Sequence, residues 1–421
     1  MAGLVFYLRK SSCSSELKPY FYPALFLKLL CGLLLGVLYF EYYQEGDTLQ
    51  YYRRGLWATD IISKESPAAY LKYLILDVVP ASNPLAPVQV SYYSSAWNMV
   101  KLVSIPLALT GGNYYLSSLY LTLFSFAGLW FLATKLSQQF PGTAKAAVLA
   151  FLLIPSIMFW SSGVMKESFI MGGMGYCIGW LVVHKSKGIA AKVFSVLFAI
   201  AGLCLIWYVK YFVAIALGLF MILAYILKYL MKPEEKEKRR FNFKALFAML
   251  FSLGAVVLAS QLNYNLNFDQ MPVTIYENYL KYNQISANRP SIQLPALEPT
   301  YLSFAAHAPE ALIGVLFRPF LWEVYNPITL VAAIENAFLL LLVFVFLKDV
   351  IQGKVHIKAH RHLLLAALLY ILVMGVLLAF SMPNLGTLNR YRIVILPFLV
   401  FLLLQSPSSA RLLSNSKLGR L

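Results

Sequence analysis

Charged residues are scarce in this chain of 421 residues: 13% are Asp, Glu, Lys or Arg, whereas 60% are hydrophobic and the mean hydropathy is +0.68. Soluble domains contain about 25% charged residues, so this composition excludes an ordinary soluble protein. Cysteine is scarce too, and the spacing of the four cysteines argues against a disulfide framework or a cysteine metal site.

Motifs for binding nucleotides are also missing. The sequence has no phosphate-binding glycine loop, Walker motif or dinucleotide fingerprint, and its five histidines form no metal-ligand pattern. We therefore expect no cofactor, although a divalent cation could bind at the acidic residues discussed below.

Long apolar runs recur along the whole chain, and such runs are typical of membrane-spanning helices. Only helices satisfy their backbone polar groups in lipid at these lengths. The sequence therefore predicts an all-α polytopic membrane protein with one transmembrane domain, residues 1–421, and no cleaved signal peptide. About ten spans are expected, at residues 21–42, 113–134, 145–161, 167–184, 192–208, 211–230, 243–262, 327–347, 363–381 and 391–406.

Positive charge is concentrated on one side of this predicted topology. That side receives 23 of the 35 Lys and Arg and 5 of the 18 Asp and Glu; the other side receives 12 of each, and Glu335 lies within a span. Lys and Arg favour cytoplasmic loops. We therefore expect a protein of the bacterial inner membrane with both termini in the cytoplasm. Because this asymmetry explains most of the net charge of +17, the charge does not indicate nucleic-acid binding.

Two large loops, residues 43–112 and 263–326, are then expected on the extracytoplasmic side. Both are too apolar for free loops, and Tyr and Trp are dense in the first, which favours helices lying at the membrane interface. We expect such helices within 47–80 and 95–111. The second segment is apolar enough to span, but counting it as a span would move the Lys-rich loops outside, so we interpret it as interfacial or re-entrant.

Two acidic residues are candidates for catalysis because they lie where a lipid-linked polar substrate would arrive. Asp47 follows the first span in EGDTLQYYRR and could deprotonate an acceptor hydroxyl, or simply cap the next helix. Glu167 follows PSIMFWSSGVMK in a turn too short to leave the membrane surface. Ionisable residues there are often functional, although Glu167 could also pair with Lys166.

Basic residues on the outer side are candidates for binding a phosphate or pyrophosphate, since the positive-inside rule disfavours them there. A structural alternative is anchoring to anionic lipid headgroups. The functional interpretation requires them to converge on one outer cavity. The candidates are Arg53, Arg54, Lys166, Arg318, Arg390 and Arg392, together with Tyr391.

This layout resembles the GT-C class of integral membrane glycosyltransferases. In that class an acid follows the first span, as Asp47 does, a second acid often follows a Pro and Ser run, as Glu167 does, and a late Arg-Tyr recurs, as in Arg390-Tyr391-Arg392. The resemblance implies transfer of a sugar from a polyprenyl-phosphate donor to an envelope glycan or lipid acceptor, with inversion and with Asp47 as base. Lys166-Glu167 replaces the plain Asp of that pattern, and no large soluble C-terminal domain is present, which leaves the acceptor open.

Two other functions stay open. The GDT–Tyr stretch and the arginine-rich outer turn are also similar to the O-antigen and exopolysaccharide polymerases, which would make the chain a polyprenyl-pyrophosphate-linked glycan polymerase or ligase. The third possibility is a transporter or flippase of a lipid-linked substrate, for which Glu335 within a span could carry protons. A transporter should show inverted repeats or matching broken helices, and the sequence shows neither.

The predicted topology can be tested by labelling. Thiol reagents that do not cross the membrane should label Asn83→Cys and Asn288→Cys in intact cells, because both positions lie in the loops predicted to be extracytoplasmic. Labelling only after the inner membrane is permeabilised would contradict the topology.

Overall fold

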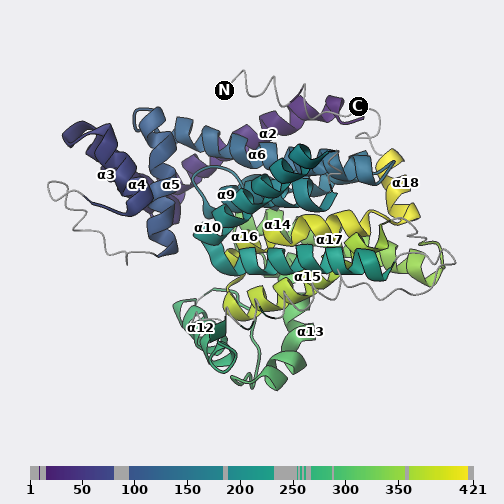
Figure 1. Ribbon diagram of the computed structural model, residues 1–421. Helices are drawn as coiled ribbons and strands as arrows, with labels where there is room; N and C mark the ends of the chain where they lie inside the picture. The colour runs from purple at the N-terminus through teal and green to yellow at the C-terminus, as the bar shows by residue number, and fades with distance from the viewer. Residues whose placement is uncertain are drawn as a thin grey trace. The chain divides into compact units, whose positions relative to one another are not determined.

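The computed structural model describes residues 9, 16–79, 94–183, 188–231, 254, 257, 260–261, 267–286, 289–355 and 360–415. Within these ranges the chain is helical and has no strand, only an isolated bridge between Ser291 and Asn384 (Figure 1). The predicted all-α fold is confirmed. The labelling positions Asn83 and Asn288, and most of the predicted span 243–262, lie outside the described residues.

The contacts divide the chain into two compact units, each built from two segments. Unit 1 consists of Met1–Gln139 and Met158–Ala214. Its elements are α2 (Lys18–Val37), η1 (Leu38–Tyr43), α3 (Asp47–Lys64), α4 (Pro67–Leu76), α5 (Ser95–Leu109), α6 (Tyr114–Gln139), α9 (Lys166–Cys177), η3 (Ile178–Val183) and the first part of α10 (Ile189–Leu230).

Unit 2 consists of Phe140–Ile157 and Ile215–Leu421, and α8 (Pro155–Trp160) straddles the boundary between the units. Its elements are α7 (Ala144–Val148), η2 (Leu149–Leu153), the second part of α10, α12 (Met271–Ile285), α13 (Tyr301–Phe317), η5 (Leu321–Glu323), α14 (Pro327–Ile351), α15 (Arg361–Ser381), α16 (Leu385–Tyr391), η6 (Arg392–Val394), α17 (Leu396–Leu403) and α18 (Pro407–Asn415).

Five described helices are long and apolar enough to cross a membrane. They are Lys18–Tyr43, Tyr114–Gln139, Ile189–Lys228, Pro327–Ile351 and Arg361–Ser381, and the pair Leu385–Val394 and Leu396–Leu403, bent by 64°, would make a sixth. Each overlaps one or more of the predicted spans. The protein is therefore an all-α membrane protein, whereas the count of ten spans stays a prediction.

The longest of these helices contains a break. Lys210 in α10 has a non-helical backbone, with φ −148° and ψ 90°. The break lies between the predicted spans 192–208 and 211–230, so it supports two successive helices rather than one. The predicted span 145–161 is also interrupted, because Ile154 is extended and Pro155 starts a new helix.

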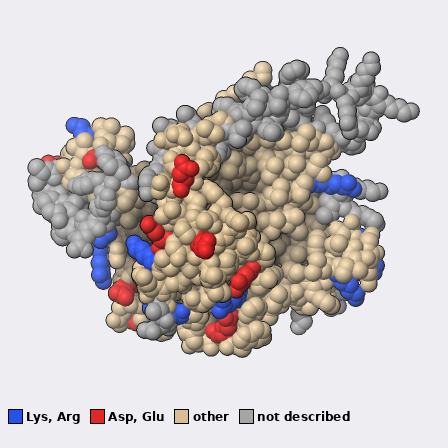
Figure 2. All heavy atoms as spheres, turned by 90° about the horizontal axis from the view of Figure 1, so that it is seen from below, with Lys and Arg blue, Asp and Glu red and all other residues tan. Residues whose placement is uncertain are grey.

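Helix α14 buries several of its polar side chains and exposes several large apolar ones. Glu335, Asn336 and Asp349 are buried, whereas Phe344 is 67% exposed. This is the reverse of a helix at the surface of a soluble protein, and it fits lipid surroundings, where ionisable residues face the protein interior. Figure 2 likewise shows broad areas of one face with neither acidic nor basic side chains.

Within unit 1, α6 and α9 meet through glycines. A Cβ on Gly175 would lie 2.2 Å from the carbonyl oxygen of Gly128, and a Cβ on Gly128 would lie 2.2 Å from that of Gly172. Small residues let two membrane helices approach until their backbones touch, which maximises van der Waals contact where the hydrophobic effect is absent.

Replacing one of these glycines should therefore destabilise unit 1. We expect Gly175→Ala to lower the free energy of unfolding by about 1–3 kcal/mol, the usual range for overpacking. Gly218→Ala is the matched control, because it also lies in a helix but no described atom lies within 4 Å of its added Cβ. Thermal unfolding in detergent measures both, and equal midpoints for the two variants would contradict the close packing of α6 and α9.

Candidate functional site

The turn before α3 determines where Asp47 lies. Gln44 and Gly46 have positive φ angles of 56° and 116°, and at Gly46 a Cβ would lie 2.9 Å from the Tyr39 ring, so only glycine fits. The chain thus reverses directly after η1. Gly46 is the N-cap of α3 and Asp47 is its first residue, so the alternative that Asp47 is the cap is wrong. Next to it, the buried Thr48 hydroxyl is 2.9 Å from the Tyr114 hydroxyl at the start of α6, which fixes this end of α3.

Lys166 links three elements near this end of α3. Its ammonium group donates to the Ser95 hydroxyl at the start of α5, over 2.8 Å, and lies 5.8 Å from the centre of the Tyr51 ring on α3, within the range of a cation–π contact. Tyr51 is one helical turn after Asp47, so both residues share a face of α3. The structure thus brings the Lys166 cation to the face of α3 that begins with Asp47.

The two arginines of α3 differ in position. Arg54 follows Tyr51 by three residues and shares the face of Asp47, whereas Arg53 points to another side and is exposed. Helices α3, α4 and α5 lie side by side (Figure 1). Of the two predicted phosphate ligands on α3, Arg54 is the one on the face that Lys166 contacts.

Glu167 is fully buried, and its Oε1 atom accepts a hydrogen bond from Lys210, 2.9 Å away. The sequence suggested Lys166 as the pairing partner, but the partner is the lysine at the break of α10. Removing one member of a buried ion pair strongly destabilises the folded protein, because the other charge is left buried without a partner. This geometry favours a structural role for Glu167, in holding α9 to α10, and its catalytic role stays a prediction.

In unit 2, Arg392 is a buried side chain with protein acceptors. It is 1% exposed, and it donates to Glu335 over 3.4 Å and to the carbonyl oxygens of Leu316 and Arg318 over 3.3 and 3.4 Å. Glu335 also accepts from the Ser156 backbone N–H and hydroxyl, at 2.8 and 2.7 Å, at the start of α8. This network gives the buried carboxylate of Glu335 its hydrogen-bond partners. The hydrogen bonds of Arg392 in it go to protein acceptors and not to a ligand.

Arg318 is also engaged by the protein. Its guanidinium donates to both carboxylate oxygens of Glu323, and to the Ser291 carbonyl oxygen over 3.3 Å. Burial raises the pKa of Glu323, but the hydrogen bonds from Arg318 and from the Phe320 N–H outweigh it, so the pKa lies below its usual value. Arg318 therefore fastens the turn between α13 and α14.

The turn between α15 and α16 is joined to the segment between α12 and α13 by backbone hydrogen bonds. The Ile292 N–H donates to the Pro383 carbonyl oxygen over 2.9 Å, and the Leu385 N–H donates to that of Pro290 over 3.0 Å. Arg390 follows on α16, half-buried, with its guanidinium 5.2 Å from the centre of the Tyr391 ring. Arg390 therefore lies against the aromatic ring of its neighbour in the chain.

The predicted site residues are thus distributed over both units. Unit 1 contains Asp47, Arg53, Arg54, Lys166 and Glu167, and unit 2 contains Arg318, Arg390, Tyr391 and Arg392. Within unit 1, Asp47, Arg54 and Lys166 belong to one face of α3. Convergence of all the basic residues on one cavity stays a prediction.

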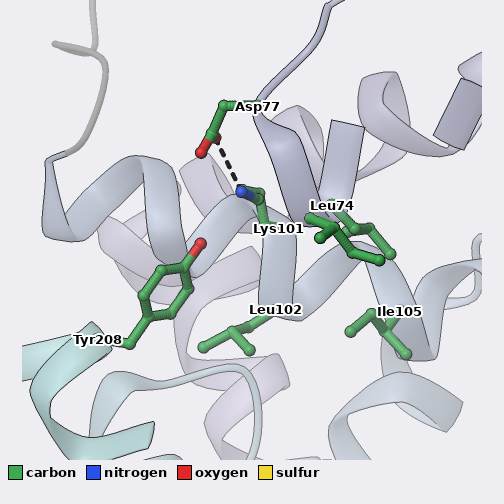
Figure 3. A pocket seen from close by; sticks show the side chains of 7 residues that line it. Leu74, Asp77, Lys101, Leu102, Ile105 and Tyr208 are labelled. Atoms are coloured by element: carbon green, nitrogen blue, oxygen red, sulfur yellow. Dashed lines mark hydrogen bonds and ion pairs between the residues drawn. The ribbon is translucent and has the colours of Figure 1, made fainter. Parts of the chain in front are cut away.

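Unit 1 also contains a pocket that the sequence did not predict. It has a volume of about 250 Å³ and lies between α4, α5 and α10 (Figure 3). At its polar end Lys101 pairs with Asp77 over 2.8 Å, and the Trp97 indole N–H donates to the same carboxylate oxygen over 2.7 Å. Tyr208 forms another wall, with its ring centre 5.9 Å from the Lys101 ammonium group.

No family model, curated protein or solved structure matches this chain.

A signal for this pocket was present in the sequence. Lys101 is the single charged residue of the apolar helix α5, and a lone charge in such a helix needs a partner. Asp77 follows the apolar run of α4 directly and is one possible partner. The sequence does not identify it as the partner of Lys101, because that depends on how α4 packs against α5. For metals, no group of three or more His, Cys, Asp or Glu is found within the described ranges, and a divalent cation at Asp47 or Glu167 stays a prediction.

The network around Glu335 should be structural. We expect Glu335→Ala to lower the free energy of unfolding by about 3–5 kcal/mol, because Arg392 is left buried without its counter-charge. Replacing both residues, as Glu335→Ala with Arg392→Met, should recover much of this loss. Glu310→Ala, at an exposed position of α13, is the control. If Glu335→Ala unfolds at the same temperature as that control, the network does not stabilise unit 2.

Proposed function

We propose that this protein is a membrane glycosyltransferase that transfers a sugar from a polyprenyl-phosphate donor to an envelope glycan or lipid acceptor on the extracytoplasmic face. The observation that carries the proposal is the contact of Lys166 with Tyr51 and Ser95. It brings a cation to the face of α3 that begins with Asp47, so that one patch of unit 1 contains both a base and a charge suited to phosphate.

In the proposed reaction, the acceptor hydroxyl oxygen attacks the anomeric carbon of the sugar, and its proton passes to the Asp47 carboxylate. The bond between that carbon and the phosphate oxygen breaks, and polyprenyl phosphate leaves with the electron pair. Attack opposite the leaving group inverts the anomeric carbon. Lys166 and Arg54 would stabilise the charge that develops on the phosphate, and no general acid is needed because phosphate is a stable leaving group.

The rival functions have less support. A proton-coupled transporter would need a membrane carboxylate that protons can reach, but Glu335 is 4% exposed and its oxygens accept hydrogen bonds from Ser156 and Arg392. A pyrophosphate-dependent polymerase would be expected to use several arginines of the outer turns, but Arg318 and Arg392 contact protein acceptors.

The role of Asp47 is tested by Asp47→Asn. This change is nearly isosteric, and Asp47 is the first residue of α3 rather than its cap, so the variant loses the base while the helix keeps its N-cap. We expect the protein to keep its unfolding temperature and to lose about a hundredfold or more of its turnover. Turnover is measured as the glycan product in the envelope, by mass spectrometry, in a strain that lacks the natural gene and expresses each variant.

Asp60→Asn is the matched control for this test. Asp60 lies on the same helix and is a partly exposed residue paired with Lys64 over 3.1 Å, and surface pairs of this kind contribute little. It should retain full turnover. A stable and fully active Asp47→Asn protein would show that Asp47 is only an acidic residue in the first turn of α3, and would favour the polymerase or the transporter.

A further inference from the structure

The pocket between α4, α5 and α10 has more hydrogen-bonding capacity than its own contacts use. The Oδ1 atom of Asp77 accepts from both Trp97 and Lys101, while no donor within the described ranges contacts its Oδ2 atom. The Lys101 ammonium group has three N–H donors, one of which goes to Asp77. The Tyr208 hydroxyl points to the same side of the pocket (Figure 3) and has no described partner.

The charge of this polar end selects the kind of ligand. Lys101 is buried and paired with Asp77, so the two charges cancel and an anion gains little from binding there. A carboxylate oxygen, ammonium N–H groups and a tyrosine hydroxyl together suit a neutral group that both donates and accepts. Neighbouring hydroxyls of a sugar have these properties, and the ring of Tyr208 offers an apolar face beside them.

The other end of the pocket is apolar. It is lined by Leu74, Ile75, Leu102 and Ile105, and Ile75 and Ile105 are 73% and 43% exposed. The volume of about 250 Å³ is below that of pockets for drug-sized ligands, about 300–1,000 Å³, and suits a group of the size of one monosaccharide. The pocket therefore suits an amphiphile with a hydroxyl-bearing head and a hydrocarbon tail.

We propose that this pocket binds a sugar of the lipid-linked glycan acceptor; as an acceptor site it rests on the proposed function. Its position fits this role. Lys101 follows Ser95, the residue that Lys166 contacts, by six positions on α5, which is about 9 Å along a helix. Both groups thus contact the same helix, about 9 Å apart along its axis and on different sides of it, so a lipid-linked glycan held by Asp77, Lys101 and Tyr208 would lie near the basic group proposed for the donor phosphate.

Binding of a simple glycolipid tests the site without knowledge of the natural acceptor. The probe is radiolabelled octyl β-D-glucoside, below its micelle concentration, added to the full chain in phosphatidylcholine nanodiscs. We expect saturable binding of the glucoside. Unlabelled 1-octanol and octyl phosphate should displace it only poorly. Tyr208→Phe removes one hydroxyl group, and Asp77→Asn keeps the shape of the side chain but removes its charge and one acceptor oxygen. Each should weaken binding about fivefold, as expected for loss of a hydrogen bond. Because Asp77→Asn also leaves Lys101 without its counter-charge, its unfolding temperature is measured alongside and should lie above the temperature of the binding assay.

Two controls separate this proposal from the glycosyltransferase proposal. Tyr211→Phe, a residue of the same helix that does not line the pocket, and Asp47→Asn should both bind the probe like the natural protein. The pocket proposal is overturned if Tyr208→Phe and Asp77→Asn bind normally, or if octyl phosphate binds better than the glucoside. If Asp47→Asn keeps full turnover while the probe still maps to this pocket, a glycolipid site stands and the transferase proposal fails alone.

Discussion

A charged side chain surrounded by lipid has no water to solvate it, so it must find its partners within the protein. This constraint explains the buried ion pairs of both units. Glu167 pairs with Lys210 in unit 1, and Glu335 pairs with Arg392 and caps α8 in unit 2. Removal of either member of a pair leaves an unpaired charge in the protein interior. Each pair therefore holds together the segments that carry its two members, and it fixes the positions of the side chains next to them.

The same constraint separates structural charges from chemical ones. Glu167 and Arg392 are buried against protein partners, whereas Asp47, at the start of α3, and Lys166, at the start of α9, are only partly buried. A group that acts on a substrate must be reachable, and a group that holds two helices need not be. Burial therefore ranks Asp47 and Lys166 above Glu167 and Arg392 as groups that a substrate could contact.

Much of the fold was predictable because lipid permits so few structures. The predicted spans 21–42 and 327–347 correspond to helices Lys18–Tyr43 and Pro327–Ile351, since a run of apolar residues fixes both the type and the approximate length of a span. The segment 95–111 is the helix Ser95–Leu109, as expected. Its placement at the interface depends on a membrane position that helix length alone does not fix.

The partners of charged residues were not predictable. Lys210 reaches Glu167 across 43 positions of the chain, and Arg392 reaches Glu335 across 57. No local pattern encodes such pairs, because they depend on how the helices pack. The pocket at Lys101 was missed for the same reason: its acid, its indole and its tyrosine come from α5 and from segments on either side of it.

The pairing of Glu335 with Arg392 also bears on the response of the protein to membrane voltage. A single charge that crosses the membrane field gains or loses about 2.3 kcal/mol per 100 mV, which is enough to bias a conformational equilibrium. A bound acid–base pair has no net charge, so the field exerts almost no net force on it. Changes in membrane potential should therefore leave the conformation of this part of unit 2 almost unaffected.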